Sequence, residues 1–272
     1  LVSVTEEASP IVLLANKLEV SLLSTNKRLT DVLSEKDPAQ LAELTKELEG
    51  SRKLFTESLN NFKHEAEKLP LLESYVPTLE KASKSYLDGT ANLAQQRAEL
   101  LTLLRQTNKG KSEFQAIMPL FKQELSDMLG KIDDSYVQGV FRTMQARQSP
   151  IEVTTFDALN QSSPALVAAA LERNRKQLAD YNKAIADLKL EIPSLENDIG
   201  LYIKSFILNT TQDKGLLAHY LELVKTQVAL EKQAKDASLQ VMAVQAELGR
   251  LQQVAQGVMD KSIENANHTL AT

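Results

Sequence analysis

Cysteine is absent from this 272-residue sequence, and glycine, proline and aromatic residues are all scarce. Without cysteine the chain has no disulfide, no thiolate metal site and no cysteine nucleophile. Nine glycines, eight prolines and 5% aromatic residues make a protein built mainly from β-sheets improbable on composition. Since 43% of the residues are hydrophobic, the composition favours a helical protein with a buried core.

A strong charge of one sign and long apolar runs are also missing. The 31 basic and 36 acidic residues are intermixed and sum to −5, so no basic face predicts a nucleic-acid partner. No run reaches the roughly 18 apolar residues of a membrane span, and no leader with a charged and then an apolar part opens the chain. Because helical spacing starts almost at Leu1, we expect the chain to be a piece of a longer protein.

Apolar residues three and four positions apart predict six helices. The first ends before Asp37, which can cap the second helix, with Pro38 at its first position. Pro70 stops the second helix. The third is a long helix over 72–129, with a weak point at 108–111 and a second bend at Pro119. A short helix over 137–144 follows, then one over 164–206 that Ser163 can cap and that kinks at Pro193, and one from 216 nearly to the end. The segment 147–164 is expected to be the main irregular connection.

The helix lengths predict an all-α fold of two stacked modules. At 1.5 Å per residue, the third and sixth helices span roughly 85 Å, whereas the first two span about 45 Å. Six mainly antiparallel helices are therefore expected to form two stacked four-helix bundles that share the two long helices. Within a single domain over 1–272, one module takes about 1–100 plus 240–272, and the other about 101–239. Both chain ends then fall at the tip of the first module, as in a domain looped out between two membrane helices.

Three stretches resemble the extracytoplasmic sensor region of bacterial methyl-accepting chemotaxis proteins that have a sensor domain of the helical bimodular type. They are "VTEEASPIVLLANKLEVSLLSTNKRLTDVL", "DPAQL" and "AELGRLQQVAQGVMDKSIENANHTLAT". The resemblance implies a periplasmic domain of an inner-membrane receptor, with the 1–100 module nearest the membrane and a homodimer as the assembly. A small molecule, such as an organic acid, would bind inside a bundle and shift a helix through the membrane.

Two other functions fit the same pattern. Similar bundles occur in hybrid histidine kinases, where a periplasmic binding protein docks on the sensor, here through the segment 149–163. A ligand-free structural rod would satisfy the same apolar stripes, and its mark would be complete apolar filling of both bundles. Dicarboxylate-binding relatives carry paired arginines on the first helix, where this chain has Asn16, Lys17, Lys27 and Arg28. No family binding residue is therefore carried over by position.

Arg97 is the first candidate for ligand contact, because it falls on or beside the apolar face of the third helix. A buried guanidinium needs a partner, which a ligand carboxylate would supply, with Thr90 or Asn92 adding a polar contact. Arg250 on the last helix is expected to face the same bundle. Alternatively both arginines lie at the rim, with their stems on apolar neighbours and their heads in water.

Polar residues interrupt the apolar face in the second module and give the other candidate site. Tyr181, Tyr202, Tyr220 and Gln227 can line a pocket beside small neighbours, and Asn174 interrupts the same face. The alternative is that these tyrosines are core aromatics with their hydroxyls at the edge.

No catalytic or metal pattern appears. His64, His219 and His268 are far apart and form no ligand motif, so no metal and no cofactor are expected. The chain has no nucleophile elbow and no glycine-rich phosphate loop, so an enzyme is not expected.

Overall fold

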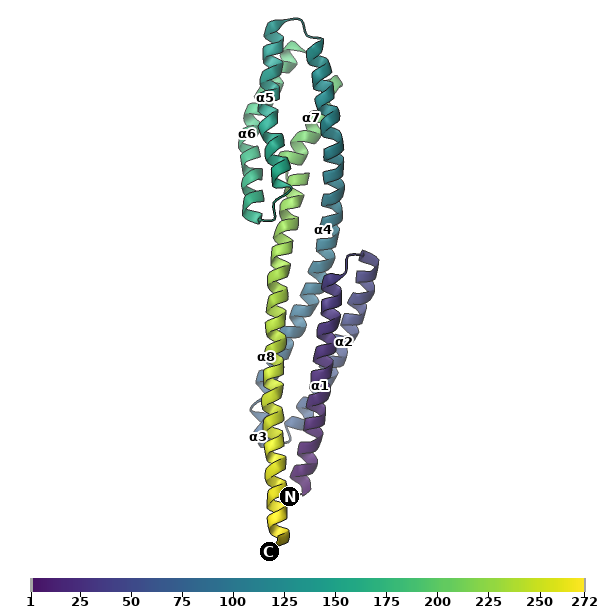
Figure 1. The fold of residues 1–272 in the computed structure, drawn as a ribbon, viewed down its shortest axis with the longest axis vertical. Helices are drawn as coiled ribbons and strands as arrows, with labels where there is room; N and C mark the ends of the chain where they lie inside the picture. Colours follow the sequence, from purple (N-terminus) through teal and green to yellow (C-terminus); the bar gives the residue numbers. More distant parts are fainter. Residues whose placement is uncertain (1, 272) are drawn as a thin grey trace. The chain divides into compact units, whose positions relative to one another are not determined.

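The computed structural model of the protein describes residues 2–271, and these form helices without any strand. Figure 1 shows their course. The helices are α1 (Val2–Ser34), α2 (Pro38–Ala66), the single turn α3 (Pro70–Glu73), α4 (Val76–Gly130), α5 (Ser135–Ala158), α6 (Pro164–Glu191), α7 (Leu195–Thr211) and α8 (Leu216–Ala271). The predicted all-helical class is confirmed, while the described residues contain seven helices and one isolated turn instead of six helices. Within residues 2–271, no helix is both long and apolar enough to cross a membrane.

The predicted helix starts at Pro38 and Pro164 are found, and so is the long third helix, which begins at Val76 instead of near Leu72. The Asp37 carboxylate accepts a hydrogen bond from the backbone N–H of Ala39, and Pro38 begins α2. Ser163 caps α6 in the same way, ahead of Pro164. The helix α4 runs without a break through the weak point at 108–111 and through Pro119.

The prediction for residues 137–164 is wrong. A short helix followed by an irregular connection was expected, but α5 continues through Pro150 to Ala158. The apolar face of the helix continues past the proline, where Ile151, Thr155 and Ala158 are all buried. Burial on that face offsets the hydrogen bond that Pro150 removes.

The prediction of one kinked helix over 164–206 is also wrong. The chain forms α6 and α7, separated at residues 192–194. Ile192 has φ −125° and ψ 87°, an extended conformation that suits a residue directly before a proline. Pro193 therefore ends the helix instead of bending it.

The chain divides into two compact units at Glu99/Leu100 in α4 and at Val228/Ala229 in α8. Unit 1 comprises residues 2–99 and 229–271, and unit 2 comprises residues 100–228. The second boundary was predicted about ten residues further on, near 239. In unit 1, α1 begins and α8 ends at the same end of the bundle (Figure 1).

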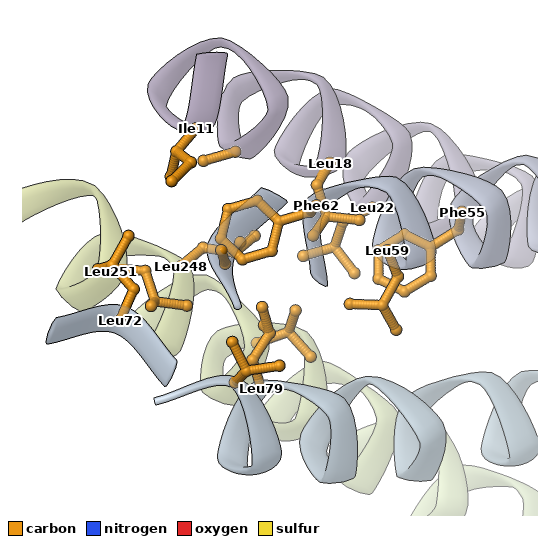
Figure 2. Close-up of a cluster of buried hydrophobic side chains, with 14 of the residues drawn as sticks. Ile11, Leu18, Leu22, Phe55, Leu59, Phe62, Leu72, Leu79, Leu248 and Leu251 are labelled. Carbon is orange, nitrogen blue, oxygen red and sulfur yellow. The ribbon is translucent and has the colours of Figure 1, made fainter. Parts of the chain in front are cut away.

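The core of unit 1 is almost entirely apolar. Side chains from α1, α2, α3, α4 and α8 meet in one buried cluster, which Figure 2 shows. Its largest members include Phe55, Phe62 and Tyr86, none of which is exposed. At about 2–3 kcal/mol for each fully buried large side chain, this cluster is the main stabilising feature of the unit.

Polar contacts in unit 1 join α4 to the hairpin of α1 and α2 along its length. The Tyr86 hydroxyl donates to Asn26 Oδ1 at 3.2 Å, and Arg52 Nε donates to the Leu87 carbonyl at 3.2 Å. Further along, Lys63 Nζ lies 3.0 Å from a carboxylate oxygen of Glu80. The helix α8 is joined to the hairpin by Gln252 Nε2, which donates to Asn16 Oδ1 at 3.0 Å.

The hairpin α1–α2 of unit 1 and the hairpin α5–α6 of unit 2 repeat one pattern of burial. Most buried positions pair with a buried position 126 residues later without a gap, and Pro38 and Pro164 match in the turn. Eleven pairs are buried in both hairpins: Ala15 with Phe141, Leu18 with Met144, Leu22 with Gln148, Thr25 with Ile151, Leu29 with Thr155, Val32 with Ala158, Leu41 with Val167, Leu48 with Asn174, Phe55 with Tyr181, Leu59 with Ile185, and Phe62 with Leu188. The two hairpins therefore share one register.

Gly215, between α7 and α8, is required by a close backbone approach. A Cβ added there would lie 1.7 Å from the Leu208 carbonyl oxygen. We expect Gly215→Ala to lower the free energy of unfolding by about 2–3 kcal/mol, measured by urea unfolding followed by circular dichroism. Gly139 in α5 is the matched control, because a Cβ there meets nothing within 4 Å. Gly139→Ala is expected to raise stability by about 0.5–1 kcal/mol, and an equal effect of both changes contradicts the packing argument.

Candidate functional site

Arg97 binds the end of α1. Its Nε and Nη2 both donate to the backbone carbonyl of Glu35, at 3.2 and 2.7 Å. This carbonyl lies just past the last residue of α1, where helix carbonyls lack internal partners and the helix dipole is negative. Burial lowers the pKa of Arg97, and the nearby Glu35 carboxylate opposes this shift. The guanidinium therefore has a structural partner within the chain.

The other candidates in unit 1 do not gather around Arg97. Thr90 is buried, and its hydroxyl donates to the Leu87 carbonyl one turn earlier. Asn92 is exposed. Arg250 is exposed and pairs with Glu247 on its own helix at 3.0 Å. The structure therefore does not bring the guanidinium groups of Arg97 and Arg250 together.

The candidates in unit 2 occupy separate places as well. The ring of Tyr202 stacks on Phe121, with centroids 5.4 Å apart, and the Tyr220 hydroxyl donates to the Gln161 carbonyl. Gln227 is half-buried on α8. Tyr181 alone lies fully inside, where its hydroxyl donates to Gln148 Oε1 at 2.7 Å. The predicted four-residue pocket is therefore not assembled, but Tyr181 leads to a polar interior.

Comparison of the two hairpins shows at which positions this interior has polar side chains instead of apolar ones. Four positions that are leucine or phenylalanine in α1–α2 carry hydrogen-bonding side chains in α5–α6, and all are buried in both. They are Leu22 against Gln148, Leu29 against Thr155, Leu48 against Asn174, and Phe55 against Tyr181. Since the first hairpin forms with apolar residues at these positions, the fold does not require polar ones.

These four residues form two layers across α5 and α6, seven residues apart on each helix. Gln148 and Tyr181 make the first layer through the 2.7 Å hydrogen bond. In the second, Asn174 Nδ2 donates to Thr155 Oγ1 at 2.9 Å and to the Thr210 carbonyl of α7 at 3.0 Å. Hydrogen bonds between buried partners at these distances fix the side-chain orientation.

The second layer contains an acceptor without a donor. The Thr155 hydroxyl donates to the Ile151 carbonyl, so it must accept from the amide of Asn174. The Asn174 amide is therefore oriented, and its Oδ1 is buried without any hydrogen-bond partner. Gln177 Oε1, one turn further along α6, is also buried and unpartnered. A buried acceptor left unpaired costs about 1–3 kcal/mol, a cost that a bound donor would remove.

Glu152 lies on α5 between the two layers and is the most buried carboxylate described here. Its side chain is 10% exposed and its Oε1 lies 2.5 Å from Lys122 Nζ of α4. A groove of about 300 Å³ opens beside this pair, lined by Lys122, Leu125, Gln145, Gln148, Ser149 and Glu152. Gln148 therefore contacts both the inner layer and a space open to solvent.

Gln148, Glu152 and Lys122 were not predicted as site residues. The first two lie within the segment 147–164 that was expected to be irregular, where helical spacing was not followed. The signal that could have found these two is the 126-residue repeat, because it aligns Gln148 with Leu22 and Glu152 with Asn26. Lys122 precedes the repeat and has no such signal. Asn174 was noted as an interruption of the apolar face, but without its partners.

Comparisons with known proteins return nothing that identifies the chain. No family model matches, and neither a curated protein nor a solved structure is similar enough to count as a match. Among the described residues, no three His, Cys, Asp or Glu side chains are grouped so as to hold a metal ion. The geometry of unit 2 is therefore the basis for a functional proposal.

Removing the Arg97 side chain tests its role at the end of α1. We expect Arg97→Ala to lower the free energy of unfolding by about 1 kcal/mol, because the Glu35 carbonyl loses both donors. Arg97→Lys should restore only part of this, since an ammonium does not reproduce two donors in one plane. Lys84→Ala, an exposed change on the same helix, is the control in urea unfolding. Unchanged stability of Arg97→Ala contradicts the assignment.

Two buried tyrosines predict a loss of stability at alkaline pH. Burial raises the pKa of Tyr86 and of Tyr181 above the ordinary value of 10.0. Because the unfolded chain then releases these protons first, the free energy of unfolding falls as pH rises above about 10, by up to about 1.4 kcal/mol per pH unit for each tyrosine. Urea unfolding at pH 9–11 checks this. Tyr86→Phe and Tyr181→Phe should each make the decline shallower, and an unaltered slope in both contradicts the prediction.

Proposed function

We propose that the chain is a ligand-binding sensor domain that takes a small molecule into the polar interior of unit 2. In this proposal the chain is the periplasmic part of an inner-membrane chemoreceptor, forms a homodimer, and has two stacked four-helix bundles that share α4 and α8. The resemblance of the sequence to chemoreceptor sensor regions supports this. So does the arrangement of unit 1, where α1 begins and α8 ends at the same end of the bundle.

The observation that carries the proposal is the pair of polar layers in α5–α6. An interior position that tolerates leucine in one hairpin is held by glutamine or asparagine in the other, at a cost in stability. Natural proteins keep such costly polar groups inside mainly at functional sites. The open groove at Gln148 gives a small molecule a way to the first layer.

The signal in this proposal is a change in helix packing. A ligand held between α4, α5 and α6 favours the packing in which its contacts are complete. A small shift of a long helix is the common way in which such a preference is passed on. The helix α8 reaches from unit 2 into unit 1, so it is the element that would carry the shift.

The two alternative functions fit the structure less well. A ligand-free rod predicts complete apolar filling of both bundles, which does not fit the buried polar layers of α5–α6 and the unpartnered Asn174 Oδ1. Docking of a binding protein was expected through an irregular segment at 149–163, but residues 149–158 are helical and the connection is only five residues long. Most of the irregular segment through which docking was expected is therefore helix.

Copying the apolar layers of the first hairpin into the second tests the proposal. The double variants are Gln148→Leu with Tyr181→Phe, and Thr155→Leu with Asn174→Leu. We expect each to fold and to be more stable than the wild type by about 1 kcal/mol or more, because buried polar groups are replaced by packed apolar ones. Thermal unfolding is measured with a panel of amino acids, amines, carboxylates and sugars. Stabilisation by a compound in the wild type should be lost in at least one double variant.

Two results contradict the proposed function. One is a panel in which no compound stabilises the wild type. The other is a compound that stabilises both double variants as strongly as the wild type, since its site then lies outside the polar layers. Leu54→Gln, an exposed change on α2 of unit 1, is the control and should leave every compound effect unchanged.

A further inference from the structure

The groove between α4 and α5 holds an asymmetric ion pair. The Glu152 side chain is 10% exposed, whereas the Lys122 side chain is 58% exposed and reaches the carboxylate from the rim. The position equivalent to Glu152 in the first hairpin is Asn26, which is neutral and accepts from the Tyr86 hydroxyl. The hairpin register therefore does not require a charge at this position.

The asymmetry decides which charge the groove accepts. A buried carboxylate must keep a cationic partner, because leaving it unpaired is costly. Lys122 can return to water at little cost when another cation replaces it, since more than half of its side chain is already exposed. An anion that drew Lys122 away would instead leave Glu152 without its partner. The groove therefore favours an incoming cation over an incoming anion.

The remaining lining residues suit the other end of a small ligand. Because Gln148 Oε1 accepts from Tyr181, its Nε2 group is left to donate elsewhere, and Gln148 lines the groove. Ser149 and Gln145 add a hydroxyl and an amide. Once displaced from Glu152, Lys122 remains beside these donors. An acceptor group two or three bonds from an ammonium, such as the carboxylate of an α-amino acid, thus has partners here.

We propose that this groove binds a small molecule through a primary ammonium group on Glu152, with an α-amino acid as the class that uses the whole site. The inference rests on the proposed function, in which unit 2 holds the ligand, and it replaces the organic acid expected from the resemblance. The groove volume of about 300 Å³ is at the lower end of small-molecule sites and suits a compound of this size.

A second ion pair in unit 2 supplies the matched control. Lys189 Nζ lies 2.7 Å from Glu196 Oε2, beside another groove between α6 and α7. Both side chains are about half exposed, at 45% and 55%. Glu196 is solvated and has no need of a replacement cation, so Glu196→Gln removes the same charge from the same unit without touching the proposed site.

The experiment measures binding of three probe groups to the full chain by thermal shift and calorimetry. The groups are the standard α-amino acids, the amines ethanolamine and 1,4-diaminobutane, and the acids acetate and succinate. We expect stabilisation only by compounds that carry a primary ammonium group. Glu152→Gln should weaken their binding at least tenfold, whereas Glu196→Gln should leave it unchanged. Lys122→Met should strengthen binding of the simple amines, because it removes the competing ammonium.

Ser149→Leu tests the same groove if Glu152→Gln does not fold. Ser149 is exposed at the rim, and a leucine there would fill the groove without altering the ion pair, so binding should again fall at least tenfold. Two results of this experiment overturn the inference while the proposed function stands: stabilisation by acids alone, or by amines that bind Glu152→Gln and Ser149→Leu as tightly as wild type. Stabilisation by sugars alone in the wider panel that tests the proposed function has the same meaning. If no compound of either panel binds, the inference and the proposed function both fail.

Discussion

A polar atom removed from water costs free energy unless it finds a partner, and this constraint separates the two hairpins. In unit 1 the unpartnered buried atoms Ser83 Oγ and Gln96 Oε1 both lie on α4, and none of those found lies on α1 or α2. In unit 2 paired side chains meet the constraint across α5 and α6, while Asn174 Oδ1 and Gln177 Oε1 of α6 are left without a partner. A chain that bears this cost in one hairpin, at positions where the other has leucine or phenylalanine, has a use for the polar groups.

The repeated hairpin makes that argument possible without any related protein for comparison. The hairpin α1–α2 has leucine at the buried positions equivalent to Gln148, Thr155 and Asn174, in the same register. It therefore shows directly that an apolar side chain can fill these positions. Unit 1 thus serves as an internal reference for what packing alone needs, and the differences in α5–α6 stand out against it.

Helical periodicity was enough to predict most of the fold but little of the site. It gave the helical class, the caps at Asp37 and Ser163 and the unbroken course of α4, because each depends on local spacing and short-range hydrogen bonds. It failed around Pro150 and Pro193, where the outcome depends on how much apolar surface the following residues bury. One proline was tolerated within α5, and the other ended α6.

The site was harder because its parts are polar residues on the buried face of a helix. Tyr181 was named, since an aromatic residue among leucines is conspicuous. Gln148 and Glu152 look like surface residues in sequence, and only the packing of α5 against α4 and α6 shows that they are buried. Arg97 shows the opposite error, because its position suggested a ligand contact and the structure gives it a carbonyl of its own chain.

The distribution of polar bonds in unit 1 has a mechanical consequence. Bonds at Arg97, Tyr86, Leu87 and Glu80 anchor α4 to the α1–α2 hairpin at several heights, so sliding α4 along its axis would break them together. Gln252 of α8 adds a bond to Asn16 of α1. The hairpin and α4 of unit 1 are therefore held in one axial register, and a displacement of either along the other would have to break these bonds in a single step.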